Sequence, residues 1–179
     1  MGTYIKTLVE VRTSDGWKHS EAKVFELDAW AAAKNGELMT ERPFYWQSYR
    51  IFGFLAGVRN EAESHVLSEP RGLPEDADPT SIAELIPGAF EVYGAFGEDL
   101  EMSVAERVEQ TQGDRFGFSW LSAEELLAFD YDQEFSDRRE QSPEVSTYRD
   151  FLGEPFFRHL AALAEIGPKE DVRILFCFD

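Results

Sequence analysis

The segment DVRILFCFD, residues Asp171 to Asp179, decides the fold. Its seven inner residues are β-branched, aromatic or otherwise apolar except for Arg173, and they show no alternation of polar and apolar positions. A continuous apolar run of this length is typical of a strand that is covered on both faces. The sequence therefore predicts a central strand and a core element at this end of the chain, so that its removal would unfold the protein.

The other end of the chain predicts partner strands. MGTYIKTLVEVR alternates imperfectly, Ser14-Asp15-Gly16 is a turn signal, and a strand-like pattern continues from Trp17 to Leu27. This order predicts a β-hairpin. In contrast, the segment FGFSW, Phe116 to Trp120, follows a polar run and precedes a helix-start signal, and we interpret it as a loop.

Between the two ends the apolar spacing becomes helical. The stretch YRIFGFLAGVRN, residues 49–60, predicts a helix with one aromatic face, in which Gly53 and Gly57 allow close backbone packing. Ser122 and Glu125 form a capping box that predicts a helix over Ala123–Phe129. Its expected inward-facing residues are Leu126, Leu127 and Phe129.

A longer helical pattern leads into the last strand. It covers Thr147–Ile166, is broken or kinked at Gly153 and Pro155, and ends at Gly167-Pro168. The stretches before and within GLPEDADPTS have too many turn signals for a regular element. We therefore expect one domain over residues 1–179. Its class is α+β, with a mainly antiparallel sheet formed by the N-terminal hairpin and the C-terminal strand, packed helices and long acidic loops.

Composition agrees with a globular protein in a reducing cytoplasm. The chain has 179 residues, 43% of them hydrophobic, and no apolar run of about 18 residues that would predict a membrane span. The N-terminal stretch lacks the apolar block of a signal peptide, so we expect no export. The single cysteine, Cys177, is expected to be a buried small apolar residue.

Charge is the strongest functional signal in the sequence. Thirty-five acidic residues against seventeen basic ones give a net charge of −18. Residues 60–110 contain thirteen acidic residues against Arg71 and Arg107, a local net charge of −11. Such a charge repels nucleic acid and anionic membranes and attracts basic partners. The segment is either a solubilising surface or an acidic face that competes with nucleic acid for a basic protein groove, and the candidate partner-binding residues are Glu75, Asp76, Asp78, Glu84, Glu91, Glu98, Asp99 and Glu101.

Catalytic and metal-binding motifs are absent from the sequence. None of His19, His65 and His159 has a second histidine or a cysteine at ligand spacing, and His159 is expected to be a packed core histidine. No nucleotide-binding glycine pattern or nucleophile motif occurs, and Ser119 has no adjacent base. We therefore predict no metal, no cofactor and no catalytic residue.

Arginines are scarce enough in this chain to be notable. Arg50, Arg59 and Arg71 lie beside aromatic residues or in a glycine-proline loop, where a guanidinium group can bind phosphate or carboxylate in a bidentate manner. An internal salt bridge is the favoured interpretation.

Five stretches in order carry a resemblance over nearly the whole chain. MGTYIKTLVEVR, YWQSYRIFGFLAGVRN, SEPRGLP, FSWLSAEELLAFDYD and DVRILFCFD together resemble a family of bacteriophage and prophage proteins. Its typical members open with MGCDIH and carry a His-x-His-Ser-Trp stretch before the capped helix. The resemblance implies that those members use D-x-H and H-x-H to bind a divalent metal for hydrolysis.

This chain departs from the family pattern at each of those positions. Thr3, Tyr4 and Lys6 occupy the Cys, Asp and His positions, and Phe116 and Phe118 replace the two histidines. Because phenylalanine cannot ligate a metal, the resemblance implies an apolar, aromatic pocket here.

Two hypotheses and a plainer alternative follow. The first is a non-catalytic acidic protein of phage or prophage origin that inhibits a bacterial defence complex by binding a basic protein or nucleoprotein, as anti-CRISPR proteins and DNA mimics do. The second is a nucleotide or small-ligand binder, or a residual hydrolase, whose ligand-binding residues are Lys6, Arg59, Arg71, Phe116, Phe118 and Trp120. The alternative to both is a structural or accessory phage protein in which FGFSW is simply core.

Overall fold

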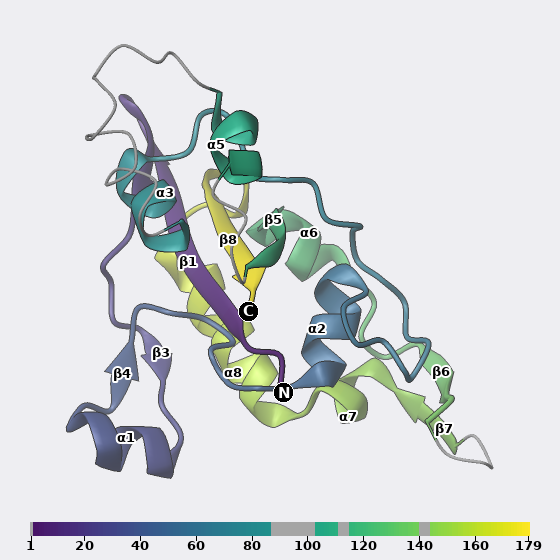
Figure 1. The fold of residues 1–179 in the computed structure, drawn as a ribbon. Helices are drawn as coiled ribbons and strands as arrows, with labels where there is room; N and C mark the ends of the chain where they lie inside the picture. The colour runs from purple at the N-terminus through teal and green to yellow at the C-terminus, as the bar shows by residue number, and fades with distance from the viewer. Residues whose placement is uncertain (1, 87–102, 111–114, 140–143) are drawn as a thin grey trace.

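The computed structural model describes residues 2–86, 103–110, 115–139 and 144–179 (Figure 1). The strands are β1 (Ile5–Thr13), β2 (Gly16–His19), β3 (Phe25–Glu26), β4 (Met39–Thr40), β5 (Phe116–Ser122), β6 (Glu134–Asp137), β7 (Glu144–Thr147) and β8 (Val172–Phe178). The helices are α1 (Ala29–Asn35), α2 (Tyr49–Ala56), α3 (Pro79–Leu85), α5 (Val104–Gln110), α6 (Ala123–Ala128), α7 (Tyr148–Leu152), α8 (Glu154–Ile166) and the 3-10 helix η1 (Lys169–Asp171).

A four-stranded antiparallel sheet organises the fold, which is α+β as the sequence predicts. The strand order is β2-β1-β8-β5. Ile174 of β8 lies opposite Val9 of β1 on one side and opposite Leu121 of β5 on the other. All seven residues of β8 are buried, which confirms the prediction of a central strand at the C-terminal end.

Side chains of β8 point alternately into two apolar clusters on opposite faces of the sheet. Phe176 and Phe178 belong to a large cluster with residues of α2, α6, α7 and α8. Leu175 and Cys177 belong to a smaller cluster with residues of α3 and α5. The result is three layers, with α3 and α5 on one face and α2, α6, α7 and α8 on the opposite face (Figure 1).

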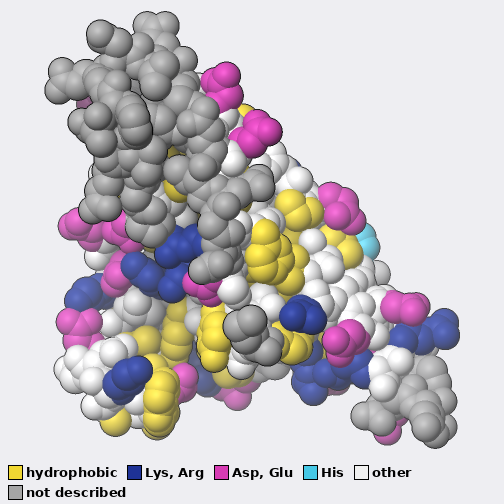
Figure 2. Space-filling model, viewed as in Figure 1, with side chains coloured by type: hydrophobic (Ala, Val, Ile, Leu, Met, Phe, Trp, Pro, Cys, Tyr) yellow, Lys and Arg dark blue, Asp and Glu magenta, His cyan; other side chains and the backbone are white. Residues whose placement is uncertain are grey.

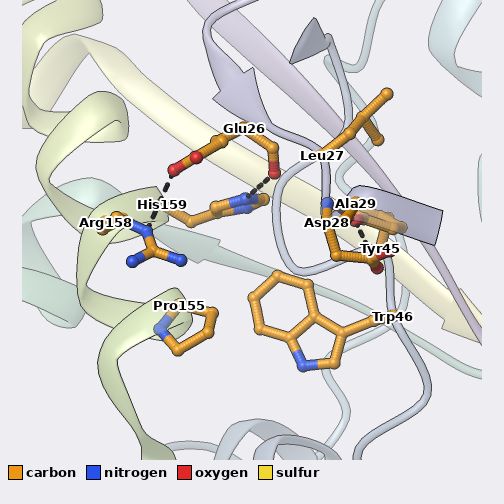
Figure 3. A pocket seen from close by; sticks show the side chains of 9 residues that line it. All are labelled: Glu26, Leu27, Asp28, Ala29, Tyr45, Trp46, Pro155, Arg158 and His159. Atoms are coloured by element: carbon orange, nitrogen blue, oxygen red, sulfur yellow. Dashed lines mark hydrogen bonds and ion pairs between the residues drawn. The ribbon is translucent and has the colours of Figure 1, made fainter. Parts of the chain in front are cut away.

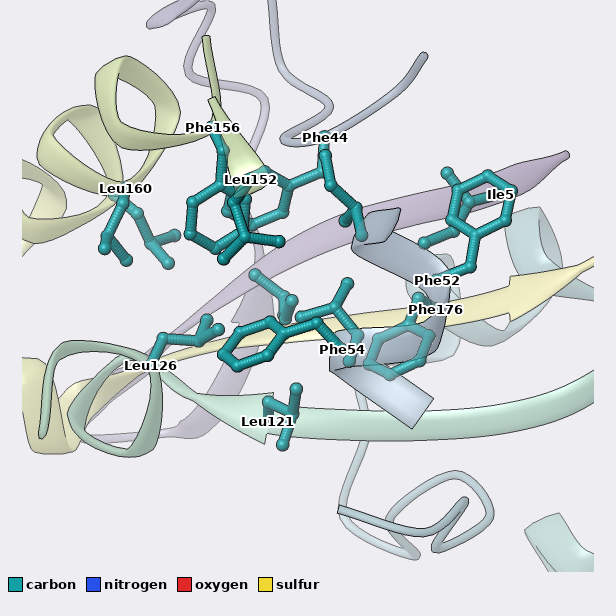
Figure 4. Packing of buried hydrophobic residues seen from close by; sticks show 14 of the residues in the cluster. Ile5, Phe44, Phe52, Phe54, Leu121, Leu126, Leu152, Phe156, Leu160 and Phe176 are labelled. Carbon is teal, nitrogen blue, oxygen red and sulfur yellow. The ribbon is translucent and has the colours of Figure 1, made fainter. Parts of the chain in front are cut away.

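Phenylalanine rings fill the larger cluster (Figure 4). Phe44 and Phe156 stack with centroids 4.7 Å apart, and Phe54 meets Phe156 edge to face at 6.1 Å. All three side chains are fully buried. Burying a side chain of this size contributes roughly 1.5–3 kcal/mol, so this layer is the main source of stability.

The predicted helix signals operate as expected, with two exceptions. The helix predicted over residues 49–60 ends at Ala56, because Gly57 adopts the left-handed conformation and caps α2. A Cβ atom on Gly53 would lie 2.8 Å from Asn60 Oδ1, which confirms close packing there. Ser122 and Glu125 form the capping box of α6. The prediction that Leu127 points inward is wrong. Its side chain is 38% exposed, because Leu126 occupies the buried face of this short helix.

The long helical pattern before β8 divides into two helices. Gly153 has a φ of 82° and separates α7 from α8, and Pro155 lies in the first turn of α8. This confirms the predicted break. Proline is tolerated in the first turn of a helix because the N–H that it lacks has no partner there.

The strand predicted over Trp17–Leu27 is interrupted. β2 ends at His19, and the last bond to β1 is the one from the Ser20 N–H to the Val9 carbonyl oxygen at 2.9 Å. The His19 N–H donates to Asp78 Oδ2 at 2.7 Å. After residues 20–23, which are exposed or half-buried, Phe25 and Glu26 form β3, which pairs with β4 in a separate two-stranded sheet. With α1, these strands project from the rest of the molecule (Figure 1).

The loop interpretation of FGFSW was also wrong. These residues begin β5 at the edge of the main sheet, with a register shift between Phe116 and Ser119. Gly117 has a φ of 62°, which accommodates this irregularity.

The acidic middle segment, which was expected to be loop, contains helix α3. Asp78 caps the N-terminus of this helix and Pro79 occupies its first turn. No helix among the described residues is both long and apolar enough to cross a membrane.

Candidate functional site

Six described acidic residues of the middle segment lie in α3, in α5 or in the stretch just before α3, on the face of the sheet that these two helices cover. We use the name acidic layer for the described carboxylates of this face, Glu75, Asp76, Asp78, Glu84, Glu106 and Glu109. Residues 72–106 contain nine acidic residues and no lysine or arginine. The other predicted partner-binding residues, Glu91, Glu98, Asp99 and Glu101, lie outside the described residues.

Two members of the acidic layer hold the helices in place. Glu75 accepts hydrogen bonds from the N–H groups of Val104 and Ala105, at 3.0 and 3.4 Å, at the start of α5. Burial of Asp78 opposes its ionisation, but hydrogen bonds from the N–H groups of His19 and Thr80 outweigh this effect and lower the pKa of its carboxyl group. Both side chains are therefore structural as well as charged.

Three arginines from other parts of the chain contact residues 76–85 of the acidic segment. Arg173 Nη2 lies 3.0 Å from Asp76 Oδ1, and Arg42 Nη2 lies 3.1 Å from Glu84 Oε2. Arg115 donates to the backbone carbonyl groups of Glu84, at 3.1 Å, and of Leu85. The Asp76 side chain nevertheless remains 67% exposed, so ion pairing leaves it accessible to a partner.

A buried ion pair lies beneath the acidic layer. Arg173 Nε donates to Glu10 Oε2 at 2.8 Å, and the exposed fractions of these side chains are 4% and 0%. The Arg173 guanidinium lies 4.0 Å from the centroid of the Trp17 ring, and Glu10 Oε1 accepts from the Asp78 N–H at 2.7 Å. The only sequence signal for this group is that an arginine interrupts the apolar strand.

Three residues of the predicted ligand-binding set lie near the start of β1. Lys6 Nζ lies 3.6 Å from Asp179 Oδ2, and Arg59 Nε donates to Thr3 Oγ1 at 3.2 Å. Phe116 is 47% exposed and packs against Phe178. Lys6 lines a pocket of about 380 Å³ with Tyr4 and Asp179, but the other five members of the set are not among its lining residues.

The other three members, Arg71, Phe118 and Trp120, make contacts that stabilise the fold. Arg71 forms a bidentate ion pair with Glu125 and lies 4.8 Å from the Trp120 ring centroid. Phe118 is buried in the smaller apolar cluster. The favoured interpretation of the three arginines, an internal salt bridge, is confirmed for Arg71. Arg50 and Arg59 instead donate hydrogen bonds, to the Phe151 carbonyl oxygen at 3.3 Å and to Thr3 Oγ1.

The positions that the family resemblance associates with metal binding meet at one end of the sheet. Ile5 and Phe116 both lie opposite Phe178 of β8, so the Thr3–Lys6 segment and the Phe116–Phe118 segment are brought to the same sheet end. Phenylalanine offers no ligand atom there. Among the described residues, no group of three or more histidine, cysteine or acidic side chains could hold a metal ion.

His159 is the packed histidine that the sequence predicts. Its Nδ1 accepts the Phe44 N–H at 3.0 Å, and its Nε2 lies 2.8 Å from the Glu26 carbonyl oxygen, which fixes the neutral tautomer with the proton on Nε2. Burial lowers its pKa. Burial also raises the pKa of the Cys177 thiol to about 12, so this cysteine is an apolar core residue with little nucleophilic character.

Comparison of the chain with protein-family models, with curated proteins and with solved structures finds no match. The resemblance to the phage family therefore stays a prediction.

Proposed function

We propose that this chain is a non-catalytic binding protein of phage or prophage origin, which uses its acidic layer to occupy a basic groove of a bacterial protein. The partner class is a nucleic-acid-handling protein or nucleoprotein, such as a component of a defence complex. The observation that carries the proposal is the run of 35 residues, 72–106, in which nine carboxylates occur without a lysine or arginine.

The described part of this run is held in a fixed position. Asp78 caps α3, Glu75 caps the start of α5, and Arg173 fixes Asp76 from the sheet below. In Figure 2 the visible charged side chains beside α5, at the top of the molecule, are acidic, while basic side chains lie lower. A preorganised acidic surface can bind a basic groove without paying a large ordering cost.

Long-range attraction is the expected source of affinity. A net charge of −18 raises the association rate with a basic partner, and salt screens this attraction over about 10 Å at 0.1 M ionic strength. Binding should therefore weaken steeply as salt is added. Replacement of the family's predicted ligand positions by Thr3, Tyr4, Lys6, Phe116 and Phe118 supports a binding role over hydrolysis.

The test compares two triple variants that each remove three negative charges. One changes Glu84, Glu106 and Glu109 of the acidic layer to glutamine. The control changes Glu144, Glu165 and Glu170, which are exposed elsewhere, to glutamine. Each immobilised protein is exposed to bacterial lysate, and the retained proteins are identified by mass spectrometry.

The expected result is a basic nucleic-acid-binding protein that is released by salt and by excess double-stranded DNA. The acidic-layer triple variant should bind this protein at least about tenfold more weakly than the control triple does, which corresponds to about 1.4 kcal/mol. Equal retention by both triples, or retention that salt does not affect, would contradict the proposal.

A small-ligand site at the end of the sheet is the second candidate. Tyr4 and Phe116 are 55% and 47% exposed near one end of the sheet, where Lys6 and Arg59 also lie. A phosphate-bearing ligand could bind these cations while its base stacks on the exposed rings. Isothermal titration of ATP and AMP into the wild type and Lys6→Ala checks this candidate, which predicts saturable binding that the variant loses. Absence of binding to the wild type would eliminate it for these nucleotides.

A further inference from the structure

A pocket of about 380 Å³ lies between the projecting β3–α1 segment and the first two turns of α8 (Figure 3). Its walls come from three parts of the chain: Glu26 to Ala29, Tyr45 with Trp46, and Pro155 with Arg158 and His159. The volume is sufficient for a small organic molecule. No residue of this pocket belongs to the acidic layer or to the predicted ligand-binding set.

Aromatic rings form one side of the pocket. The Trp46 ring is perpendicular to the His159 ring, with centroids 4.9 Å apart, and is nearly perpendicular to the Tyr45 ring at 5.5 Å. Figure 3 shows the Trp46 indole between Pro155 and the Asp28–Tyr45 pair, facing the side of the pocket that Glu26 closes. An indole ring is the best aromatic partner for a cation.

The charge of the pocket is negative. Arg158 Nε lies 3.0 Å from Glu26 Oε2, and Arg158 Nη1 lies 2.8 Å from Glu154 Oε1, so two carboxylates balance this one cation. Asp28 adds a further carboxylate. Its oxygens accept from the Ala31 N–H at 2.9 Å and the Tyr45 hydroxyl at 2.9 Å, both neutral donors.

The protonation states of Asp28 and His159 leave this negative charge in place at neutral pH. The Ala31 and Tyr45 hydrogen bonds lower the pKa of the Asp28 carboxyl group, which is therefore ionised at neutral pH. His159 is neutral because the Phe44 N–H donates to its Nδ1. A ligand in the pocket consequently meets an aromatic wall and an excess of negative charge.

We propose that this pocket binds a small organic cation, with its ammonium group against Trp46 and near Asp28. A quaternary or methylated ammonium fits best, because it has no N–H groups that need hydrogen-bond acceptors and its methyl groups pack on indole and proline surfaces. This inference is independent of the acidic layer, since neither the residues nor the class of ligand is shared.

Choline chloride is a suitable probe, and its uncharged analogue with carbon in place of the ammonium nitrogen is the matched control ligand. The readout is the two-dimensional proton–nitrogen NMR spectrum of the full chain, in which Trp46→Phe assigns the Trp46 indole signal. Saturable shifts of this signal are expected with choline, and shifts at least about tenfold smaller at the same concentration with the neutral analogue.

Three variants locate the binding. Trp46→Leu removes the indole reporter, so its binding is followed through the backbone amide signals that shift with choline in the wild type, and these shifts should be abolished. Asp28→Asn, which keeps the helix-capping geometry, should weaken binding at least about threefold. Trp30→Leu is the control, because Trp30 lies on α1 but is 72% exposed and does not line the pocket. It should bind choline as the wild type does.

Several outcomes would overturn the inference. Equal responses to choline and its neutral analogue would show that charge has no role, and unchanged affinity of Asp28→Asn would show that the ammonium group does not bind near Asp28. If the Trp46 signal shows no saturable shift with choline, the pocket does not bind this cation. If Trp46→Leu fails to fold, as judged from its spectrum, Asp28→Asn alone decides the outcome.

Discussion

Two side chains show how much a single residue can determine in this protein. Arg173 and Glu10 form an ion pair within the sheet, where neither charge has contact with bulk water. Removal of one member of such a pair leaves the other charge buried without its partner, which typically costs 3–5 kcal/mol.

We therefore expect Arg173→Met to lower the free energy of unfolding by about 3–5 kcal/mol, measured by urea denaturation. The double variant Arg173→Met with Glu10→Gln should recover part of that loss, because no buried charge remains. Lys169→Met removes one member of an exposed ion pair with Glu124 and should change stability by less than about 1 kcal/mol. A double variant that is less stable than Arg173→Met would contradict this interpretation.

His159 should make stability depend on pH. Burial lowers its pKa in the folded protein below the value of about 6.5 in the unfolded chain. The unfolded chain therefore binds the proton first as pH falls, so the stabilisation is fully present above about pH 6.5 and is lost below it.

His159→Gln should be less stable than the wild type at pH 7.5 but lose less stability between pH 7.5 and 5.5, as measured by urea denaturation at both values. Glutamine can still accept from the Phe44 N–H and donate to the Glu26 carbonyl. His65→Gln is the control, because His65 is exposed and stacks on Phe129. If this control shows the same reduced pH dependence as His159→Gln, the assignment to His159 is wrong.

Among the elements, the edge strand β5 depends on one glycine. Gly117 combines a φ of 62° with a crowded site, since an added Cβ would lie 2.9 Å from the ring of Phe178. Gly36, at the end of α1, has a φ of 71° but no heavy atom within 4 Å of its hypothetical Cβ. The two positions therefore separate backbone strain from steric conflict.

Gly36→Ala should cost about 1 kcal/mol, the usual penalty for a left-handed backbone. Gly117→Ala should cost about 1–3 kcal/mol more, because the Phe178 ring must move within a packed core. Thermal or urea unfolding of both variants tests this difference. Equal destabilisation of the two would mean that Phe178 moves without cost.

Elements with strong local signals could be predicted from the sequence. β8 is a continuous apolar run, and α6 has a complete capping box, so each was found with correct type and position. β5 was missed because Gly117 and the polar residues before it resemble a turn, while its strand character depends on pairing with β8. α3 was missed although Asp78 and Pro79 form a helix-start signal, since neighbouring prolines and glycine obscured it.

The candidate sites were predicted less completely for a similar reason. The acidic segment can be recognised from its amino-acid composition. The arginines that bind it, Arg42, Arg115 and Arg173, come from distant parts of the sequence. The Trp46 pocket likewise needs the contact between α8 and the β3–α1 segment. Only tertiary structure brings such residues together.

At the scale of the whole molecule, two electrostatic effects oppose each other. A net charge of −18 makes the folded state repel itself, and salt weakens this repulsion. Salt also weakens the exposed ion pairs, which contribute only about 0.2–1 kcal/mol each. Because acidic residues outnumber basic ones by two to one, most carboxylates have no cation to pair with.

Repulsion should therefore dominate, and the thermal midpoint should rise as sodium chloride is increased from about 0.02 to 0.3 M, over which the Debye length falls from roughly 20 to 6 Å. The triple variant of Glu144, Glu165 and Glu170 to glutamine carries three fewer negative charges and should show a smaller rise. Potassium chloride should reproduce the wild-type curve, since screening depends on ionic strength and not on the identity of the cation. A midpoint that falls with salt would instead mean that ion pairs such as Arg42–Glu84 and Arg71–Glu125 outweigh the repulsion, and that the acidic layer is largely neutralised within the fold.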